Sequence, residues 1–183
     1  GTTANMTANE VIANRAIEIL GGVKGDYSIV HPNDHVNRAQ STNDVFPSAA
    51  KLTAIKLLRK AIAQVERLEA ALAEKEKEFH DIIKMGRTQM QDAVPIRLGA
   101  EFGAYRKAIQ RDLVRLNRAM EGMYAINMGG TAVGTALNAN PAYVEALAPE
   151  LAKITGLPLV KADDLVDGTQ NLDCLVHVSG IIK

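Results

Sequence analysis

The sequence predicts an all-α fold dominated by two long helices. Apolar residues recur at steps of three and four over long stretches, and no stretch alternates apolar and polar residues as a half-buried strand does. The chain of 183 residues is 47% hydrophobic and 23% charged, as expected for a globular protein. Because only 4% of the residues are aromatic, we expect an aliphatic core.

The charge balance and the cysteine count narrow the class of protein. The 21 Lys and Arg residues balance the 21 Asp and Glu residues, so no net field attracts nucleic acid or an anionic membrane. No apolar run approaches the ~18 residues that a membrane-spanning helix needs, and no signal-peptide pattern is present. The single Cys174 fits a reducing compartment. We therefore expect a cytoplasmic protein with neither nucleic-acid nor membrane partners.

The first elements are a short helix and an irregular stretch. An apolar stripe over residues 7–20 predicts the helix, and Gly21-Gly22 ends it. Residues 1–5 form a polar segment typical of a loop. The residues from 23 to 40 lack a period, and His31 and His35 lie in a turn signature there. Because the two histidines have no third ligand at metal-binding spacing, we expect a hydrogen-bonded turn and no metal site.

A long helix follows this stretch. Ser-Thr-Asn-Asp at residues 41–44 offers several N-caps, and Pro47 falls early enough to be tolerated in the first turn. The helical period then continues to about Lys84, through Ile55, Leu58, Ile62, Val65, Leu68 and Leu72. About 35 residues make a helix of about 50 Å.

The second long helix begins after a break at residues 85–95. Phe102, Ile109, Leu116 and Met123 follow one another at strict steps of seven, which favours the packing of a helical bundle. Residues 127–131 end this helix. A shorter helix is predicted from Pro141 to about Thr155 with Gly156 as its cap, and another begins near Gly168.

These elements suggest how the chain is organised. Residues 1–47 are interpreted as polar loops and a short helix at the end of an N-terminal domain, and residues 48–183 as part of a central helical-bundle domain. Two long helices cannot cover their own apolar seams, so we expect them to pack with other subunits. The chain ends inside an apolar segment without a cap, which predicts a piece of a larger protein.

Small polar side chains concentrate in three breaks between helices, at residues 1–5, 40–44 and 86–89. Hydroxyl and amide groups beside free backbone N–H groups suit a carboxylate or a phosphate. The simpler interpretation of any one of these breaks is a helix cap. The sequence alone therefore points to anion binding without naming a reaction.

Five motifs together resemble the aspartase/class II fumarase superfamily in order and spacing. They are GTTANMTANEVIAN (1–14), HPNDHVN (31–37), QSTND (40–44), GRTQMQDAVP (86–95) and GGTAVGT (129–135). The resemblance covers the whole chain. It implies a homotetramer around a long helical bundle, with active sites built from several subunits, and an elimination reaction that gives fumarate. We expect no cofactor and no metal site in this chain.

The resemblance also implies roles for individual residues. Thr2, Ser41 and Thr42 would hold the distal carboxylate of a small dicarboxylate substrate, L-aspartate or fumarate. Asn43, Thr88 and Gln89 would face the α-carboxylate and the amino group. Family members place their serine base on a downstream Gly-Ser-Ser-x-Met-Pro-x-Lys-x-Asn loop that this sequence does not contain, so no catalytic base is assigned here.

Two positions favour the aspartate ammonia-lyases within the superfamily. Fumarases resemble Ser-Ser-Asn-Asp where this chain has Ser41-Thr42, and Gly-Arg-Thr-His where it has Gln89. A histidine can exchange a proton with water near neutral pH, whereas glutamine can only hydrogen-bond. A leaving ammonia needs less acid catalysis than a leaving hydroxide. The alternatives are a class II fumarase and a non-catalytic helical oligomerisation fragment.

Overall fold

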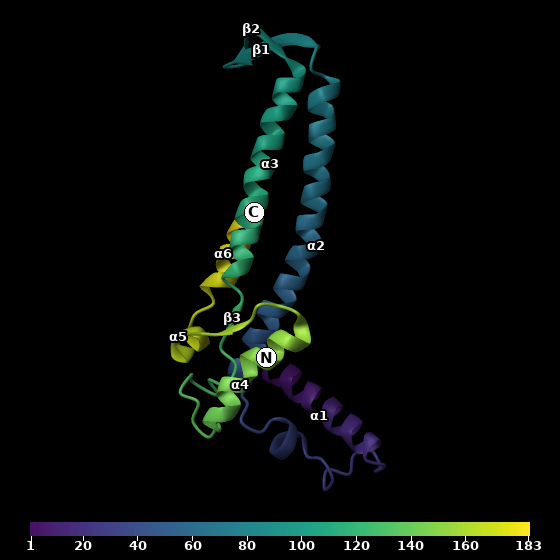
Figure 1. Ribbon diagram of the computed structural model, residues 1–183, viewed down its shortest axis with the longest axis vertical. Coiled ribbons are helices and arrows are strands. Elements are labelled where there is room, and N and C mark those ends of the chain that lie inside the picture. The colour runs from purple at the N-terminus through teal and green to yellow at the C-terminus, as the bar shows by residue number, and fades with distance from the viewer. The chain divides into compact units, whose positions relative to one another are not determined.

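The computed structural model describes residues 1–183, and it is mainly helical as the sequence predicts (Figure 1). The chain divides into two compact units. Unit 1 comprises Gly1–Ala54 with Met123–Leu175, and unit 2 comprises Ile55–Gly122 with Val176–Lys183. The domain boundary predicted between residues 47 and 48 is a different division and stays a prediction. No helix is both long enough and apolar enough to cross a membrane.

Unit 1 contains short helices, a small sheet and the first turns of a long helix. Its core includes the fully buried side chains of Ile17, Met123 and Ile126. The two short strands β3 and β4 pair in parallel through Ala125 with Val160. The elements are α1 (Thr2–Ile19), the π-helical turn η1 (Pro32–Val36), the start of α2 (Thr42–Glu78), β3 (Ala125–Ile126), α4 (Pro141–Thr155), β4 (Val160–Lys161), α5 (Leu165–Gln170) and the start of α6 (Asp173–Ile182).

Helix α4 shows how closely local chemistry sets the boundaries of an element. Asn140 caps its first turn, because the Asn140 Oδ1 atom accepts the Ala142 N–H at 2.9 Å. Pro141 occupies the first helical position, where a missing N–H costs nothing. Gly156 ends the helix in the left-handed region at φ +66°. Both predicted boundaries of this helix are confirmed.

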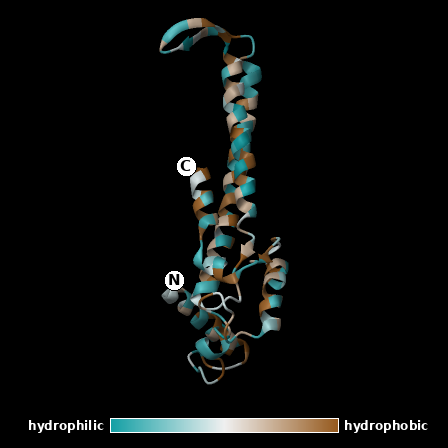
Figure 2. Ribbon diagram, turned by 90° about the vertical axis from the view of Figure 1, so that its left-hand side faces the viewer, coloured by the Kyte–Doolittle hydropathy of each residue, from teal (hydrophilic) through white to brown (hydrophobic).

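Unit 2 is built on the pairing of α2 with α3 (Leu98–Glu121), which run side by side in opposite directions (Figure 1). Hydrophilic and hydrophobic residues alternate along the column formed by the two helices, which overlap in Figure 2. The Glu69 carboxylate accepts hydrogen bonds from Arg106 Nε and Gln110 Nε2, both at 2.7 Å. The helices approach closely at Gly99, where a Cβ atom would lie 2.5 Å from the Glu76 carbonyl oxygen.

The apolar seams are only partly covered within the chain. Leu58 of α2 and Leu116 of α3 are buried. Leu68 and Tyr105 of the same helices remain exposed. Part of the apolar surface of both helices is thus left uncovered by this chain, which is consistent with the predicted packing against other subunits.

The break after α2 was interpreted wrongly as irregular, because it forms a β-hairpin. β1 (Ile83–Thr88) pairs antiparallel with β2 (Gln91–Arg97), and Thr88 lies opposite Gln91. Gln89 and Met90 form the two-residue turn, with φ values of +50° and +62°. Positive φ at both central residues is typical of a type I′ turn, which usually contains Asn-Gly. Without that signature, no local pattern of residues indicates a hairpin.

Four helix boundaries also differ from the predictions. α3 ends at Glu121 and β3 follows it, whereas the predicted end lay at residues 127–131, so Met123 lies outside the helix. α1 begins at Thr2, so the polar residues 2–5 are helical and not a loop. α2 ends at Glu78, before the predicted end near Lys84, because the chain turns into β1. The helix predicted near Gly168 is two helices, α5 and α6, since Asn171 at the end of α5 adopts an extended conformation.

Candidate functional site

The N-terminal ends of α1 and α2 adjoin in unit 1. A Cβ atom on Gly1, which precedes α1, would lie 3.4 Å from Thr42 Cγ2, the first residue of α2. Free N–H groups and the partial positive charge of helix N-termini favour a bound carboxylate or phosphate. Four of the predicted site residues, Thr2, Ser41, Thr42 and Asn43, therefore belong to one place in the fold.

A group of buried asparagines ties α1 to the segment that leads into α2. Asn5 and Asn9 lie one turn apart on the buried side of α1. Their Nδ2 atoms donate to Asn37 Oδ1 at 3.4 Å and 2.9 Å. Because Asn37 lies only four positions before Ser41, these bonds help to fix Ser41 beside Thr2.

Ser41 and Asp44 cap α2 reciprocally. The Ser41 hydroxyl oxygen accepts the Asn43 N–H at 3.2 Å, and Asp44 Oδ1 accepts the Ser41 N–H at 3.0 Å. This is the arrangement of a capping box. The capping interpretation of this break is thus correct, and it does not exclude a second role. A serine hydroxyl that accepts one bond still has its O–H proton to donate to an anion.

Pro47 leaves a backbone carbonyl of α2 free to bind a residue that follows α3. A proline has no N–H, so the Asn43 carbonyl four positions earlier lacks its usual helical partner. The side chain of Asn127 supplies the missing bond, with Nδ2 at 3.0 Å from that carbonyl oxygen. Asn127 is fully buried, and its Oδ1 accepts the Ser48 hydroxyl at 3.1 Å. The Asn43 carbonyl, which has no helical partner, therefore attaches α2 to Asn127.

The Asp44 carboxylate forms the second attachment to the same residues. Its Oδ2 atom accepts the backbone N–H groups of Gly129 at 3.2 Å and Thr131 at 2.9 Å. The side chain is 0% exposed. Burial raises the pKa of Asp44, against the lowering effect of hydrogen bonds from Ser41, Thr131 and Gly129.

A pocket of about 340 Å³ lies where these segments meet. Its lining includes the polar residues Gln40, Ser41, Thr131, Thr135 and Asn138. Three of the residues that line it, Ala39, Thr131 and Asn138, have φ values between +58° and +66° although none is glycine. Such strain persists only where the surroundings enforce it, and it is frequent at binding sites.

Thr88 and Gln89 lie at the tip of the β1–β2 hairpin in unit 2, whereas the other four predicted site residues belong to unit 1. Both side chains are exposed, and the neighbouring Met90 is 98% exposed. Arg87 pairs with Asp92 at 3.0 Å across the hairpin. Gln89 is thus presented to solvent on a turn whose backbone is strained for a residue with a side chain.

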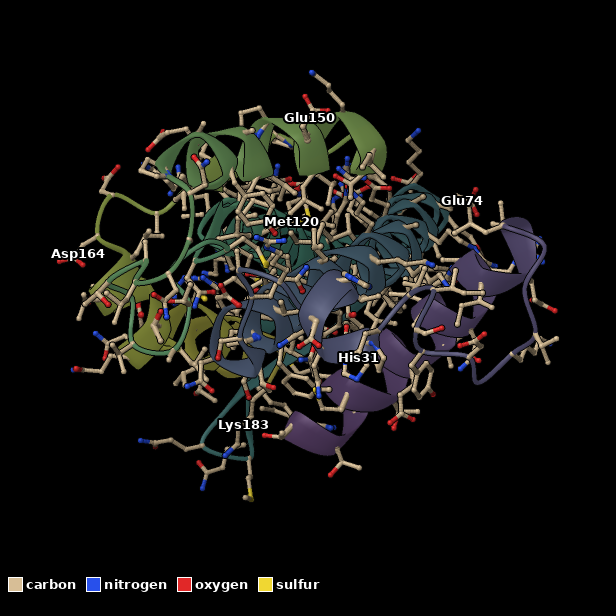
Figure 3. The ribbon with its side chains drawn as sticks, turned by 90° about the horizontal axis from the view of Figure 1, so that it is seen from below. His31, Glu74, Met120, Glu150, Asp164 and Lys183 are labelled. Atoms are coloured by element: carbon tan, nitrogen blue, oxygen red, sulfur yellow. The ribbon has the colours of Figure 1, made fainter.

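The histidine-containing stretch at residues 31–35 forms the hydrogen-bonded turn that was expected. His31, labelled in Figure 3, accepts the N–H groups of Asn33 and Asp34 at its Nδ1, each at 3.2 Å. The Nδ1 atom of His35 accepts the His31 N–H at 2.8 Å. Both imidazoles therefore stabilise the backbone of η1. No three His, Cys, Asp or Glu side chains converge in the structure to hold a metal ion.

Comparison with known proteins gives a family. A family described as Lyase matches residues 1–183, the full length of the chain. The chain belongs to this lyase family. It is 53% identical over 183 residues to an aspartate ammonia-lyase of Bacillus subtilis and 47% identical over 184 residues to a class II fumarate hydratase of Ralstonia nicotianae. All of this chain aligns in both cases, with 38% and 40% of the relatives' lengths.

Solved structures show the same fold. The cobalt-bound structure of a fumarate lyase:delta crystallin from Brucella melitensis aligns with a TM-score of 0.95 and 47% identity. The alignment covers 100% of this chain and 40% of that one. The chain thus spans about two fifths of the length of the relatives it matches, and as a member of the lyase family it has the fold that its motifs predict.

Sequence reasoning missed the residues that hold this candidate site together. Asp44 was considered only as a cap, and Asn127 and Thr131 only as the end of a helix. The one local signal was Pro47, whose position in the helix leaves the Asn43 carbonyl free for an outside donor.

Proposed function

We propose that the protein containing this chain is an aspartate ammonia-lyase, which reversibly eliminates ammonia from L-aspartate to give fumarate. The observation that supports it best is the meeting of two helix N-termini that carry hydroxyl side chains at Thr2, Ser41 and Thr42. The identity of 53% with an aspartate ammonia-lyase supports the same reaction.

The chemistry requires stabilisation of charge on the distal carboxylate. Removal of a proton from Cβ, next to that carboxylate, gives an aci-carboxylate in which both oxygens are strongly negative. Donors held in place before the reaction lower the energy of this intermediate most effectively. In the proposal, Thr2, Ser41 and Thr42 provide these donors, and the serine base belongs to a loop outside this chain.

The other end of the substrate is assigned to Asn43, Thr88 and Gln89. One hydrogen of the Asn43 amide is already donated to the Ala132 carbonyl oxygen at 2.7 Å, which fixes the orientation of that side chain. Gln89 would face the leaving amino group, and it cannot transfer a proton as a histidine would. This difference favours the loss of ammonia over the loss of water.

We further propose that the protein is a homotetramer in the cytoplasm, with active sites built from several subunits. The exposed hairpin supports this assembly, because Thr88 ends β1 and Gln89 lies in the turn between two strands that are exposed along almost their whole length. The single cysteine supports a reducing compartment. Light scattering of the whole protein tests the tetramer, and a monomer at micromolar concentration would exclude it.

A class II fumarase is the second candidate, favoured by the 47% identity with the Ralstonia enzyme. Assays of the whole protein with L-aspartate and L-malate distinguish the two. We expect the 183-residue chain by itself to show no turnover of either substrate, because the serine base is not among its residues. Loss of a principal catalytic group commonly costs several orders of magnitude in rate. In that respect the chain alone would behave as the non-catalytic fragment considered above.

A further inference from the structure

Asp44 lies behind the proposed substrate contacts without being one of them. Its side chain is 0% exposed, so a substrate in the pocket cannot touch it. Its two carboxylate oxygens face different segments. Oδ1 binds the Ser41 N–H at 3.0 Å, and Oδ2 binds the N–H groups of Gly129 and Thr131 at 3.2 Å and 2.9 Å.

We infer that Asp44 is a positioning residue that sets the spacing between the Ser41–Asn43 segment and the Gly129–Thr131 turn, and thereby the affinity of the site for a dicarboxylate. This inference rests on the proposed function, in which Ser41 and Thr42 bind the distal carboxylate. It adds a role for a residue that the motif resemblance leaves without one.

The geometry supports positioning better than capping alone. A cap needs only the Ser41–Asp44 bond, whereas the bonds to Gly129 and Thr131 join α2 to residues 85 and 87 positions away in the chain. Asp44 thus binds two residues that line the 340 Å³ pocket, Ser41 and Thr131, which belong to different segments. Asn127 binds the Asn43 carbonyl from the same side, so the turn is held at two points.

The charge of Asp44 suits this role. A carboxylate oxygen can accept two N–H bonds at once, and bonds to a charged acceptor are shorter and stronger than neutral ones. An asparagine in its place offers one oxygen, and its NH₂ group would oppose a backbone N–H donor. Asp44→Asn therefore preserves the volume of the side chain and removes at least one of the three attachments.

The test compares Asp44→Asn with two controls in the whole protein. Asp164→Asn is the matched charge control, because Asp164 (labelled in Figure 3) accepts two backbone N–H groups, as Asp44 accepts three, but caps α5 on the surface. Ile17→Ala controls for stability, since Ile17 is a fully buried residue of the same unit that lies beside Gly22, near the end of α1 opposite to Thr2.

We expect Asp44→Asn to lower kcat/KM for L-aspartate by about 10- to 100-fold, because small misplacements of binding groups are costly. The KM for L-aspartate and the Ki of succinate, which lacks the amino group, should rise by the same factor. Hydrogen exchange should accelerate in peptides that cover residues 40–45 and 128–132. Asp164→Asn should change kcat/KM less than about twofold.

A second variant tests the same point if Asp44→Asn does not fold. A Cβ on Gly130 would lie 3.1 Å from both the Asn127 carbonyl oxygen and Gly134 Cα, so Gly130→Ala shifts the turn slightly without altering Asp44. It should raise KM and Ki in the same proportion. The inference is wrong if Asp44→Asn loses no more kcat/KM than Ile17→Ala at equal loss of stability. It is also wrong if the exchange of the two segments is unchanged. Turnover of L-aspartate by the unaltered protein tests the proposed function separately.

Discussion

Replacing Gly134 by alanine should destabilise unit 1 more than the same replacement at Gly25. The two glycines have nearly equal backbone conformations, with φ values of +87° and +91°. They differ in their surroundings. A Cβ on Gly134 would lie 2.4 Å from Val166 Cα and 2.5 Å from the Leu165 carbonyl oxygen, whereas a Cβ on Gly25 meets nothing within 4 Å. The pair therefore separates steric contact from backbone strain.

The expected magnitudes follow from these two effects. An L-residue in the left-handed region costs about 1–2 kcal/mol, and both variants bear this cost. Overpacking against a neighbouring backbone adds about 1–3 kcal/mol at Gly134 alone, because the first turn of α5 must move away. Gly134→Ala should thus lose about 2–5 kcal/mol of unfolding free energy.

Urea unfolding followed by circular dichroism measures both variants. The whole protein is used at one fixed concentration, because association changes the apparent stability. The linear dependence of the unfolding free energy on urea gives the difference between variants directly from the midpoints. Equal losses of unfolding free energy at the two positions would show that residue 134 does not pack against α5. They would refute the placement of residues 129–135.

Three further predictions concern unit 2. Leu58→Ala should lower the free energy of unfolding by about 2–5 kcal/mol, because the Leu58 side chain is only 3% exposed. Leu57→Ala should lower it far less, because Leu57 is 59% exposed. The urea midpoints of the two variants give this comparison. The hydrogen bond from Arg106 lowers the pKa of Glu69, so the stability that the pair contributes is present at neutral pH and lost as pH falls through the lowered pKa. Glu69→Gln should therefore reduce the loss of stability on acidification, and an unchanged pH profile would contradict the pairing. Met90→Gly should stabilise the hairpin of the 183-residue chain by about 1 kcal/mol, because glycine adopts the positive φ of position 90 without strain. Hydrogen exchange in β1 and β2 should then be slower. Faster exchange would contradict the type I′ turn.

Elements with a local cause were predictable from the sequence. Asn140, Pro141 and Gly156 set the limits of α4 through bonds within a few residues, and the repeat of apolar residues set the two long helices. The hairpin was missed because Gln89 and Met90 adopt a turn conformation that their residue types disfavour. In a family with this fold, an unfavourable local sequence can be retained where the surrounding structure enforces it.

The candidate site was predictable only in part for the same reason. Ser41, Thr42 and Asn43 stand next to one another in the chain, so their clustering is visible in the sequence. The bond from Asp44 to Gly129 joins residues 85 positions apart, and no local pattern announces it. The grouping of Thr2 with Thr42 likewise depends on how α1 packs, through Asn9 and Asn37.

The most direct test of the account is the substrate preference of the whole protein that contains this chain. Purified protein is given L-aspartate or L-malate at equal concentrations, and the formation of fumarate is followed by its ultraviolet absorbance. We expect rapid fumarate formation from L-aspartate and negligible formation from L-malate, because a glutamine at the proposed position of Gln89 cannot supply the proton that a leaving hydroxide needs. A missing polar partner in such a site can cost a factor of about 10⁴ or more. Faster conversion of L-malate than of L-aspartate would contradict the account and identify a fumarase.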